Sequence, residues 1–133
     1  MESDFTQLKV YRKAQEIFKV SRAIACIISD NKNIMEMSIS NNYNHHFAGE
    51  IVSDSLRLVP SLAVVQNTSN YNLRLKRANN IRKAARRMLI KCRKLEFNGV
   101  KETEFLNLLK SEIQQFENLF ADWLNNLHYK KDE

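Results

Sequence analysis

Glycine and proline are almost absent from this sequence, and their scarcity limits the folds that it can adopt. The 133 residues include two Gly and one Pro. A sandwich or barrel of many short strands needs turn residues about every ten positions. Hydrophobic residues make up 44% of the chain and charged residues 27%, a balance typical of a globular protein. The sequence therefore favours a few long helices in one domain.

Four segments carry apolar residues at the three- and four-residue steps of an amphipathic helix. The last segment is the most regular, with steps that alternate between three and four from Leu106 to Leu127. The third segment has a similar seam of smaller side chains from Ala78 to Leu95. These patterns predict an all-α fold, an antiparallel up-down-up-down four-helix bundle that forms a single domain over residues 1–133. The expected helices span about residues 4–29, 45–66, 71–96 and 102–128.

The few interruptions of these patterns predict where helices bend or end. Pro60 lacks a backbone donor and would clash with the carbonyl of Leu56, so we expect the second helix to bend there. The Asn98-Gly99 pair predicts a left-handed stop after the third helix. Residues 30–44 hold five Asn and two Ser without a sustained period, which predicts a long, mobile loop.

The apolar arc of the last helix is wider than one bundle core requires. Its additional apolar residues lie beside the main seam: Phe105, Leu108, Leu119 and Leu124. Such an arc fits an oligomer interface and a broad contact within the core equally well. The sequence leaves both interpretations open.

Positive charge is concentrated in the middle of the chain. The protein has 21 Lys and Arg against 15 Asp and Glu, a net charge of +6. Residues 55–95 contain eleven Lys and Arg and no acidic residue, so this window carries +11 and the remainder carries −5. The separation of charge predicts a polyanion or an acidic protein surface as the partner.

Most of the basic residues belong to the third predicted helix. If its apolar seam faces inward, basic side chains project from the opposite and flanking sides. Six of the ten are arginines, whose planar guanidinium groups donate pairs of hydrogen bonds to phosphate. We therefore predict that RNA or DNA binds these residues: Arg74, Lys76, Arg77, Arg82, Lys83, Arg86, Arg87, Lys91, Arg93 and Lys94.

Two observations limit this interpretation. The alternative is that the basic face is solvated, or is matched by acidic residues of a neighbouring subunit, for which the last helix offers Glu102, Glu104, Glu112 and Glu117. Stacking platforms are also scarce, because Tyr71 is the only aromatic residue between Phe47 and Phe97. Binding led by shape and charge is therefore expected, without sequence-specific reading of a single strand.

The sequence offers little for catalysis, metal binding or a cofactor. His45 and His46 are neighbours and would point about 100° apart on a helix, and Cys26 and Cys92 form no Cys-x-x-Cys pair. Small helical ribonucleases of the HEPN type place an arginine four to six residues before a histidine. No histidine of this chain, His128 included, has an arginine at that distance. We therefore expect a protein that is not an enzyme and needs no cofactor.

The sequence also carries no signal for export or membrane insertion. Its N-terminus is polar and acidic, without the basic and apolar regions of a signal peptide. The longest apolar run, residues 23–28, is far shorter than the roughly 20 residues that span a bilayer. Two isolated cysteines suit a reducing compartment. We expect a cytoplasmic protein that makes no contact with membranes.

Four stretches of the chain carry a family resemblance. They are the opening residues 5–14 (FTQLKVYRKA), the Leu-Val-Pro-Ser of residues 58–61, the basic helix closed by Asn98-Gly99, and the Phe-Ala-Asp-Trp-Leu of residues 120–124. With these, the chain resembles a family of small four-helix bundles. That family includes proteins encoded in intervening sequences of bacterial large-subunit ribosomal RNA genes, and the accessory variability determinant of diversity-generating retroelements.

The residues after the proline favour the second branch. Intervening-sequence proteins usually continue this motif with Asn-Ile-Ala-Glu-Gly, whereas residues 62–65 here are Leu-Ala-Val-Val. The resemblance implies a pentameric, barrel-like homo-oligomer that binds nucleic acid and associates with a reverse transcriptase during mutagenic copying of template RNA. The alternative it implies is an oligomeric helical scaffold of the intervening-sequence type, which binds protein partners without nucleic acid.

Overall fold

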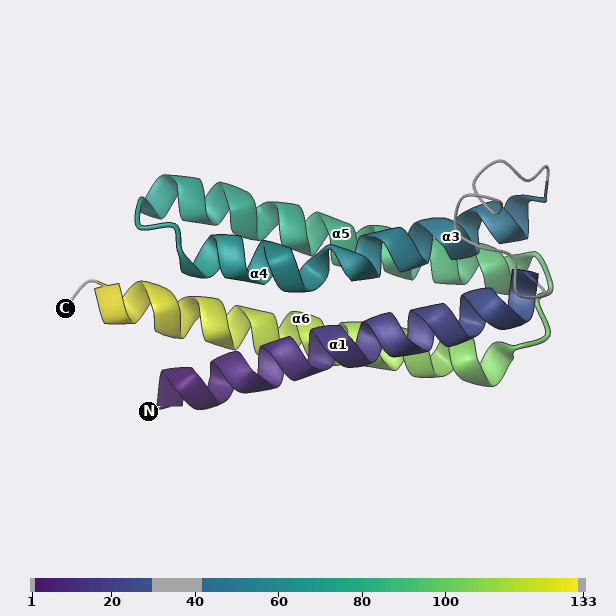
Figure 1. Ribbon diagram of the computed structural model, residues 1–133, viewed down its shortest axis with the longest axis horizontal. Helices are drawn as coiled ribbons and strands as arrows, with labels where there is room; N and C mark the ends of the chain where they lie inside the picture. The colour runs from purple at the N-terminus through teal and green to yellow at the C-terminus, as the bar shows by residue number, and fades with distance from the viewer. Residues whose placement is uncertain (1, 30–41, 132–133) are drawn as a thin grey trace.

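A computed structural model describes residues 2–29 and 42–131, and the side chains of residues 7–29 and 42–127 (Figure 1). These residues form helices and no strand, so the predicted all-α class is confirmed. The helices are α1 (Glu2–Ser29), α3 (Tyr43–Leu56), α4 (Leu58–Gln66), α5 (Tyr71–Phe97) and α6 (Thr103–Lys131). None of the described helices is long and apolar enough to cross a membrane.

Polar caps and one glycine set the ends of these helices. The side chain of Asn70 accepts a hydrogen bond of 3.0 Å from the backbone N–H of Leu73 at the start of α5. After α5, Gly99 adopts a φ of 78°, so the predicted left-handed stop is confirmed. The start of α3 precedes the expected residue 45, because Asn42 caps the helix and Tyr43 is its first residue. The loop predicted for residues 30–44 lies outside the described residues over positions 30–41.

The second predicted helix is broken into α3 and α4 at Arg57. Proline at position 60 cannot donate to the carbonyl of Leu56, and its ring crowds that carbonyl. A turn forms here, in which the backbone N–H of Arg57 donates to the backbone oxygen of Asp54 at 3.3 Å. The backbone N–H of Ser61 then donates to the backbone oxygen of Arg57 at 3.0 Å. The proline therefore interrupts the predicted helix, as a break between α3 and α4 three residues before the proline itself.

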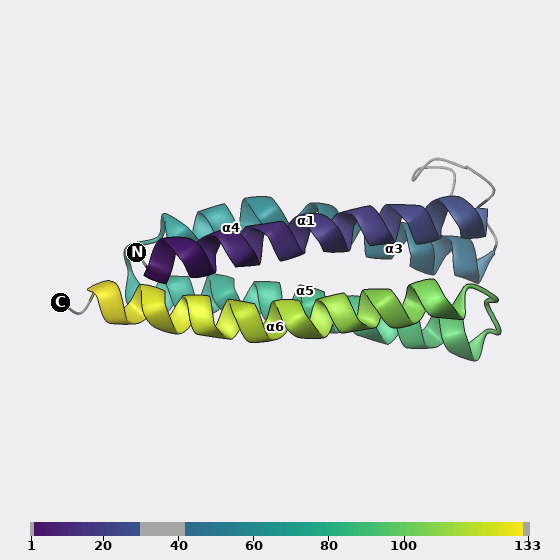
Figure 2. The same cartoon turned by 90° about the horizontal axis from the view of Figure 1, so that it is seen from below.

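The helices lie lengthwise beside one another around one core. α1 packs against α6 and α3, and α5 packs against α3, α4 and α6 (Figures 1 and 2). The start of α1, the end of α6 and the α4–α5 turn lie at one end of the molecule, and the α5–α6 turn lies at the other (Figure 1). The predicted seams of α5 and α6 both face the core, where Met88, Phe116 and Trp123 are fully buried.

The wide apolar arc of α6 is divided between interior and surface. Leu124 is buried in the core, and Leu119 is partly buried against it. Phe105 and Leu108, near the start of α6, remain exposed over 42% and 45% of their surface. Part of the arc therefore serves the core, and the other part is open.

Candidate nucleic-acid interface

The structure divides the ten predicted binding residues by their exposure. Ala78, Ile81, Ala85 and Met88 turn one side of α5 into the core. Arg74 is buried with them, while Arg77 and Lys91 are partly buried at the edges of the helix contact. The other seven are exposed, and we call them the basic strip: Lys76, Arg82, Lys83, Arg86, Arg87, Arg93 and Lys94.

Arg74 lies in the interior and not among the outward-facing cations that the sequence predicts. Only 1% of its surface is exposed. Its guanidinium group donates to the backbone oxygen of Thr68 at 3.5 Å and lies over the ring of Tyr71, 5.9 Å from the ring centre. Position 74 is four residues before Ala78, so it continues the inward seam of α5. Arg74 therefore stabilises the α4–α5 turn and does not face solvent.

Arg77 contributes to the same turn. Its Nη1 atom donates to the Thr68 hydroxyl oxygen at 2.6 Å, and that hydroxyl donates to the backbone oxygen of Val64 at 2.6 Å. The hydrogen bonds connect the first turns of α5 to the end of α4. Arg77 is thus partly occupied within the fold.

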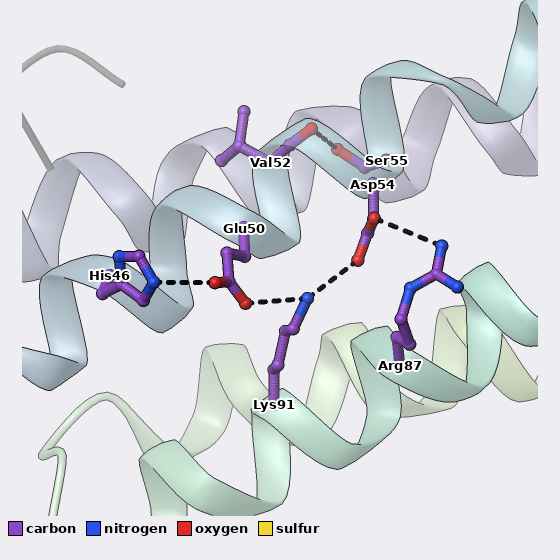
Figure 3. A network of polar contacts seen from close by, with 7 residues as sticks. All are labelled: His46, Glu50, Val52, Asp54, Ser55, Arg87 and Lys91. Atoms are coloured by element: carbon purple, nitrogen blue, oxygen red, sulfur yellow. Dashed lines mark hydrogen bonds and ion pairs between the residues drawn. The ribbon is translucent and has the colours of Figure 1, made fainter. Parts of the chain in front are cut away.

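A charged network joins α3 to α5 and engages two more of the predicted residues (Figure 3). Lys91 Nζ lies 2.9 Å from a Glu50 carboxylate oxygen and 3.1 Å from an Asp54 oxygen. Arg87 lies 3.6 Å from the other Asp54 oxygen. His46 Nε2 lies 2.8 Å from Glu50. The three α3 residues are four positions apart, so they form one row that faces α5.

Burial makes this network important for the fold. The side chains of Lys91 and Asp54 are only 16% and 8% exposed. A charge removed from water is costly unless an opposite charge compensates it, so each of the two requires the other. Burial alone would raise the pKa of Glu50, but Lys91, His46 and Lys94 together hold that pKa below its ordinary value of 4.5. Lys91 is therefore a structural cation.

The basic strip retains unpaired charge. Arg86 pairs with Glu117 of α6 at 3.2 Å while its side chain stays 67% exposed. Arg82 donates to the side-chain oxygen of Asn79 at 3.2 Å. Within the part of the chain that the structure describes, no carboxylate lies within ion-pair distance of these residues: Lys76, Arg82, Lys83, Arg93 and Lys94.

The structure adds residues that the sequence prediction did not include. Arg57, at the break between α3 and α4, lines a groove between α4 and α5 together with Arg77 and Arg87. Its position inside the acid-free window is the signal that could have identified it. Tyr43 and Phe97 lie beside the far end of the basic strip, on a surface that Arg93 and Lys94 also line.

The cysteines and histidines, which are the residues that could serve catalysis or metal binding, do not form a common site among the described side chains. Burial, followed by the charge of Glu96, raises the pKa of the Cys92 thiol to about 12, so this thiol stays protonated at neutral pH. Cys26 is exposed on α1. Among the side chains of residues 7–29 and 42–127, no three His, Cys, Asp or Glu gather closely enough to hold a metal ion. The side chain of His128 lies outside those that are described.

Comparison with family models, with characterised proteins and with solved structures found no match to this chain. The resemblance to bundles of ribosomal intervening sequences and retroelements therefore stays a prediction.

Proposed function

We propose that this protein is a noncatalytic nucleic-acid-binding protein, and that the basic strip of α5 is its contact surface. The observation that carries the proposal is a strip of seven exposed cations, of which only Arg86 and Arg87 have a carboxylate partner among the described residues. Arginine and lysine on one helix present donors to successive phosphates of a polyanion. We take the scaffold to be an antiparallel up-down-up-down four-helix bundle, in which the buried seam of α5 packs against the core.

The strip favours contact with the phosphate backbone over reading of base edges. Its residues follow one another along the outside of α5. The groove lined by Arg57, Arg77 and Arg87, which also includes Asp54, extends this surface toward α4 with an excess of positive charge. Such a surface supplies affinity that depends on salt and tolerates any sequence. The family resemblance suggests a narrower role, as the accessory protein of a reverse transcriptase in a diversity-generating retroelement. A reverse-transcriptase gene beside this reading frame would support that role.

The test compares two variants with the same loss of charge. In the first, Arg82, Lys83 and Arg93 of the strip are replaced by Gln; in the second, Arg12, Lys19 and Arg22 of α1 are replaced by Gln. Each lowers the net charge from +6 to +3, because three cations become neutral. Fluorescence anisotropy with a labelled RNA duplex, from about 50 to 200 mM salt, measures affinity and its salt dependence.

We expect the strip variant to bind more weakly and the α1 variant to bind almost as the wild type does. Each lost phosphate contact should reduce the slope of log affinity against log salt by about one, so the strip variant should lose roughly three. Equal losses in both variants would show that net charge alone attracts the RNA, and would contradict the proposed surface.

A second candidate function is an oligomeric scaffold that binds only protein. The exposed Phe105 and Leu108 of α6 favour it, since adjacent apolar residues on a helix surface are typical of subunit contacts. Mass measurement by light scattering distinguishes the two functions. A defined oligomer that binds neither RNA nor DNA would support the scaffold and reject nucleic-acid binding.

A further inference from the structure

An aromatic surface lies at the end of the basic strip, where the sequence did not predict one. Tyr43 and Phe47 at the start of α3 face Phe97, the last residue of α5, across a hollow of about 620 Å³. Phe97 is 92% exposed and Tyr43 is 76% exposed. We call this surface the aromatic patch, and its residues are Tyr43, Phe47, Ile90 and Phe97.

Polar contacts hold the two sides of the patch in place. Asn98 donates its side-chain N–H to the side-chain oxygen of Asn44 at 2.9 Å, which ties the end of α5 to the start of α3. Asn42 accepts hydrogen bonds from the backbone N–H groups of Asn44 and His45 at 2.9 and 3.4 Å. These hydrogen bonds cap the helix end that carries Tyr43 and connect it to the helix end that carries Phe97.

Cations line the same hollow as the aromatic rings. Arg93 and Lys94 belong to its wall, and Lys94 Nζ lies 5.2 Å from the centre of the Phe47 ring. Lys94 acts electrostatically on the carboxylate of Glu50, which also pairs with Lys91 and His46. The patch thus combines exposed ring faces with positive charge that is only partly compensated.

The patch is continuous with the basic strip. Ile90 lines both the aromatic hollow and a second hollow, whose other residues are Asn79, Arg82, Lys83, Arg86 and Arg87. From Arg82 to Phe97 the helix rises about 22 Å at 1.5 Å per residue. That length suits a short stretch of nucleic acid strand, at the lower end of the site sizes of about 4–16 nucleotides seen in single-strand binding proteins.

We propose that this end of α5 binds single-stranded nucleic acid by stacking an unpaired base on Phe97 and Tyr43, while Arg93 and Lys94 contact the adjacent phosphates. The inference rests on the proposed function and names its substrate class. Every base has a π face, so stacking on these rings tolerates any sequence. A duplex keeps its bases stacked inside the helix and would use only the strip. Binding should therefore be stronger for a single strand than for a duplex of equal length.

The experiment measures the anisotropy of a labelled 12-nucleotide oligouridine, of a 12-base-pair RNA duplex, and of an abasic strand with the same number of phosphates. The variants are Phe97→Ala and Tyr43→Ala. The matched control is Phe105→Ala, which removes an exposed ring from α6 instead. Circular dichroism checks that each variant keeps its helical content, and Phe97→Leu retains apolar volume without a ring.

We expect Phe97→Ala and Phe97→Leu to bind oligouridine about tenfold more weakly and to bind the duplex as the wild type does. The abasic strand should bind the wild type as weakly as oligouridine binds Phe97→Ala, and Phe105→Ala should change nothing. Equal affinity of wild type and Phe97→Ala for oligouridine would overturn the inference while leaving duplex binding, and hence the proposed function, intact. If the wild type binds none of the three probes, both are rejected.

A second measurement reports stacking directly. Trp123, the only tryptophan, is buried, so Phe97→Trp introduces the one exposed indole. Oligouridine should quench its fluorescence, and the abasic strand should not. Light scattering tests whether a second copy of the chain occupies the patch instead. If Phe97→Ala lowers the mass of the assembly and leaves the oligouridine affinity unchanged, the patch contacts a second copy, and the inference is overturned.

Discussion

The inner and outer cations of α5 differ in function although they share one helix. The inner group, Arg74, Arg77 and Lys91, is committed to the fold: it bonds the α4–α5 turn and neutralises the carboxylates of α3. The outer group, represented by Lys83 and Arg93, is exposed and has no carboxylate partner among the described residues. The difference teaches that a count of positive charges overestimates the charge available to a ligand.

Loss of Lys91 should produce the largest change in stability. Lys91→Ala leaves Asp54 buried, with only the longer contact to Arg87, so we expect the free energy of unfolding to fall by about 3 kcal/mol. Urea denaturation followed by circular dichroism measures it. Addition of Asp54→Asn to this variant removes the buried negative charge that has lost its lysine partner, and should restore part of the lost free energy of unfolding. No recovery would show that Lys91 acts through packing and not through charge.

Truncation of Arg74 should have the next largest effect. Arg74→Ala removes a buried side chain together with its contacts to Thr68 and Tyr71, and we expect a loss of about 2 kcal/mol. The duplex affinity of the folded variant should equal that of the wild type, since Arg74 is not exposed. Weaker RNA binding at unchanged stability would move Arg74 into the outer group.

The charged network should make stability depend on pH at the acidic side. The folded pKa of Glu50 lies below its ordinary value, so its contribution is complete above about pH 5 and is lost as the pH falls through the folded pKa. Glu50→Gln should therefore be less stable than the wild type at pH 7, and the difference should shrink on acidification. Thermal unfolding of both proteins from pH 7 to pH 3 tests this. A difference that is constant with pH would exclude the carboxylate as its cause.

Removal of an outer cation should change stability least. Lys83→Ala replaces an exposed lysine, which has no carboxylate partner among the described residues, by a better helix former, so we expect the free energy of unfolding to change by no more than about 0.5 kcal/mol. The same urea titration provides the comparison with Lys91→Ala. A loss above 1 kcal/mol would indicate that the outer group also supports the fold, and would erase the distinction.

The helices could be predicted from the sequence because their signals are local. The seams of α5 and α6, the break caused by Pro60 and the stop at Gly99 depend on residues within one or two turns. Arg74 could also have been placed, since it extends the seam by one step of four before Ala78. A buried position was not expected for Arg74 because a charged side chain usually stays in water. Its contacts with Thr68 and Tyr71 at the α4–α5 turn outweigh that cost.

The site was less accessible to prediction because its residues meet across the fold. Lys91 and Asp54 are 37 positions apart, and only the register of α3 against α5 brings them together. The whole basic window of residues 55–95 lies between Tyr43 and Phe97, which come from opposite ends of their helices. No spacing rule along one segment can indicate such neighbours.

The short helix α4, which follows the break at Arg57, affects the order in which parts of the protein unfold. Nine residues are too few to stay helical alone in water, so α4 keeps its shape only while Leu58, Leu62 and Val65 are shielded from solvent. Hydrogen exchange should accordingly be fastest at this joint among the packed helices. Arg57 would then move away from Arg77 and Arg87, and the groove that these three residues line would widen before the rest of the protein unfolds.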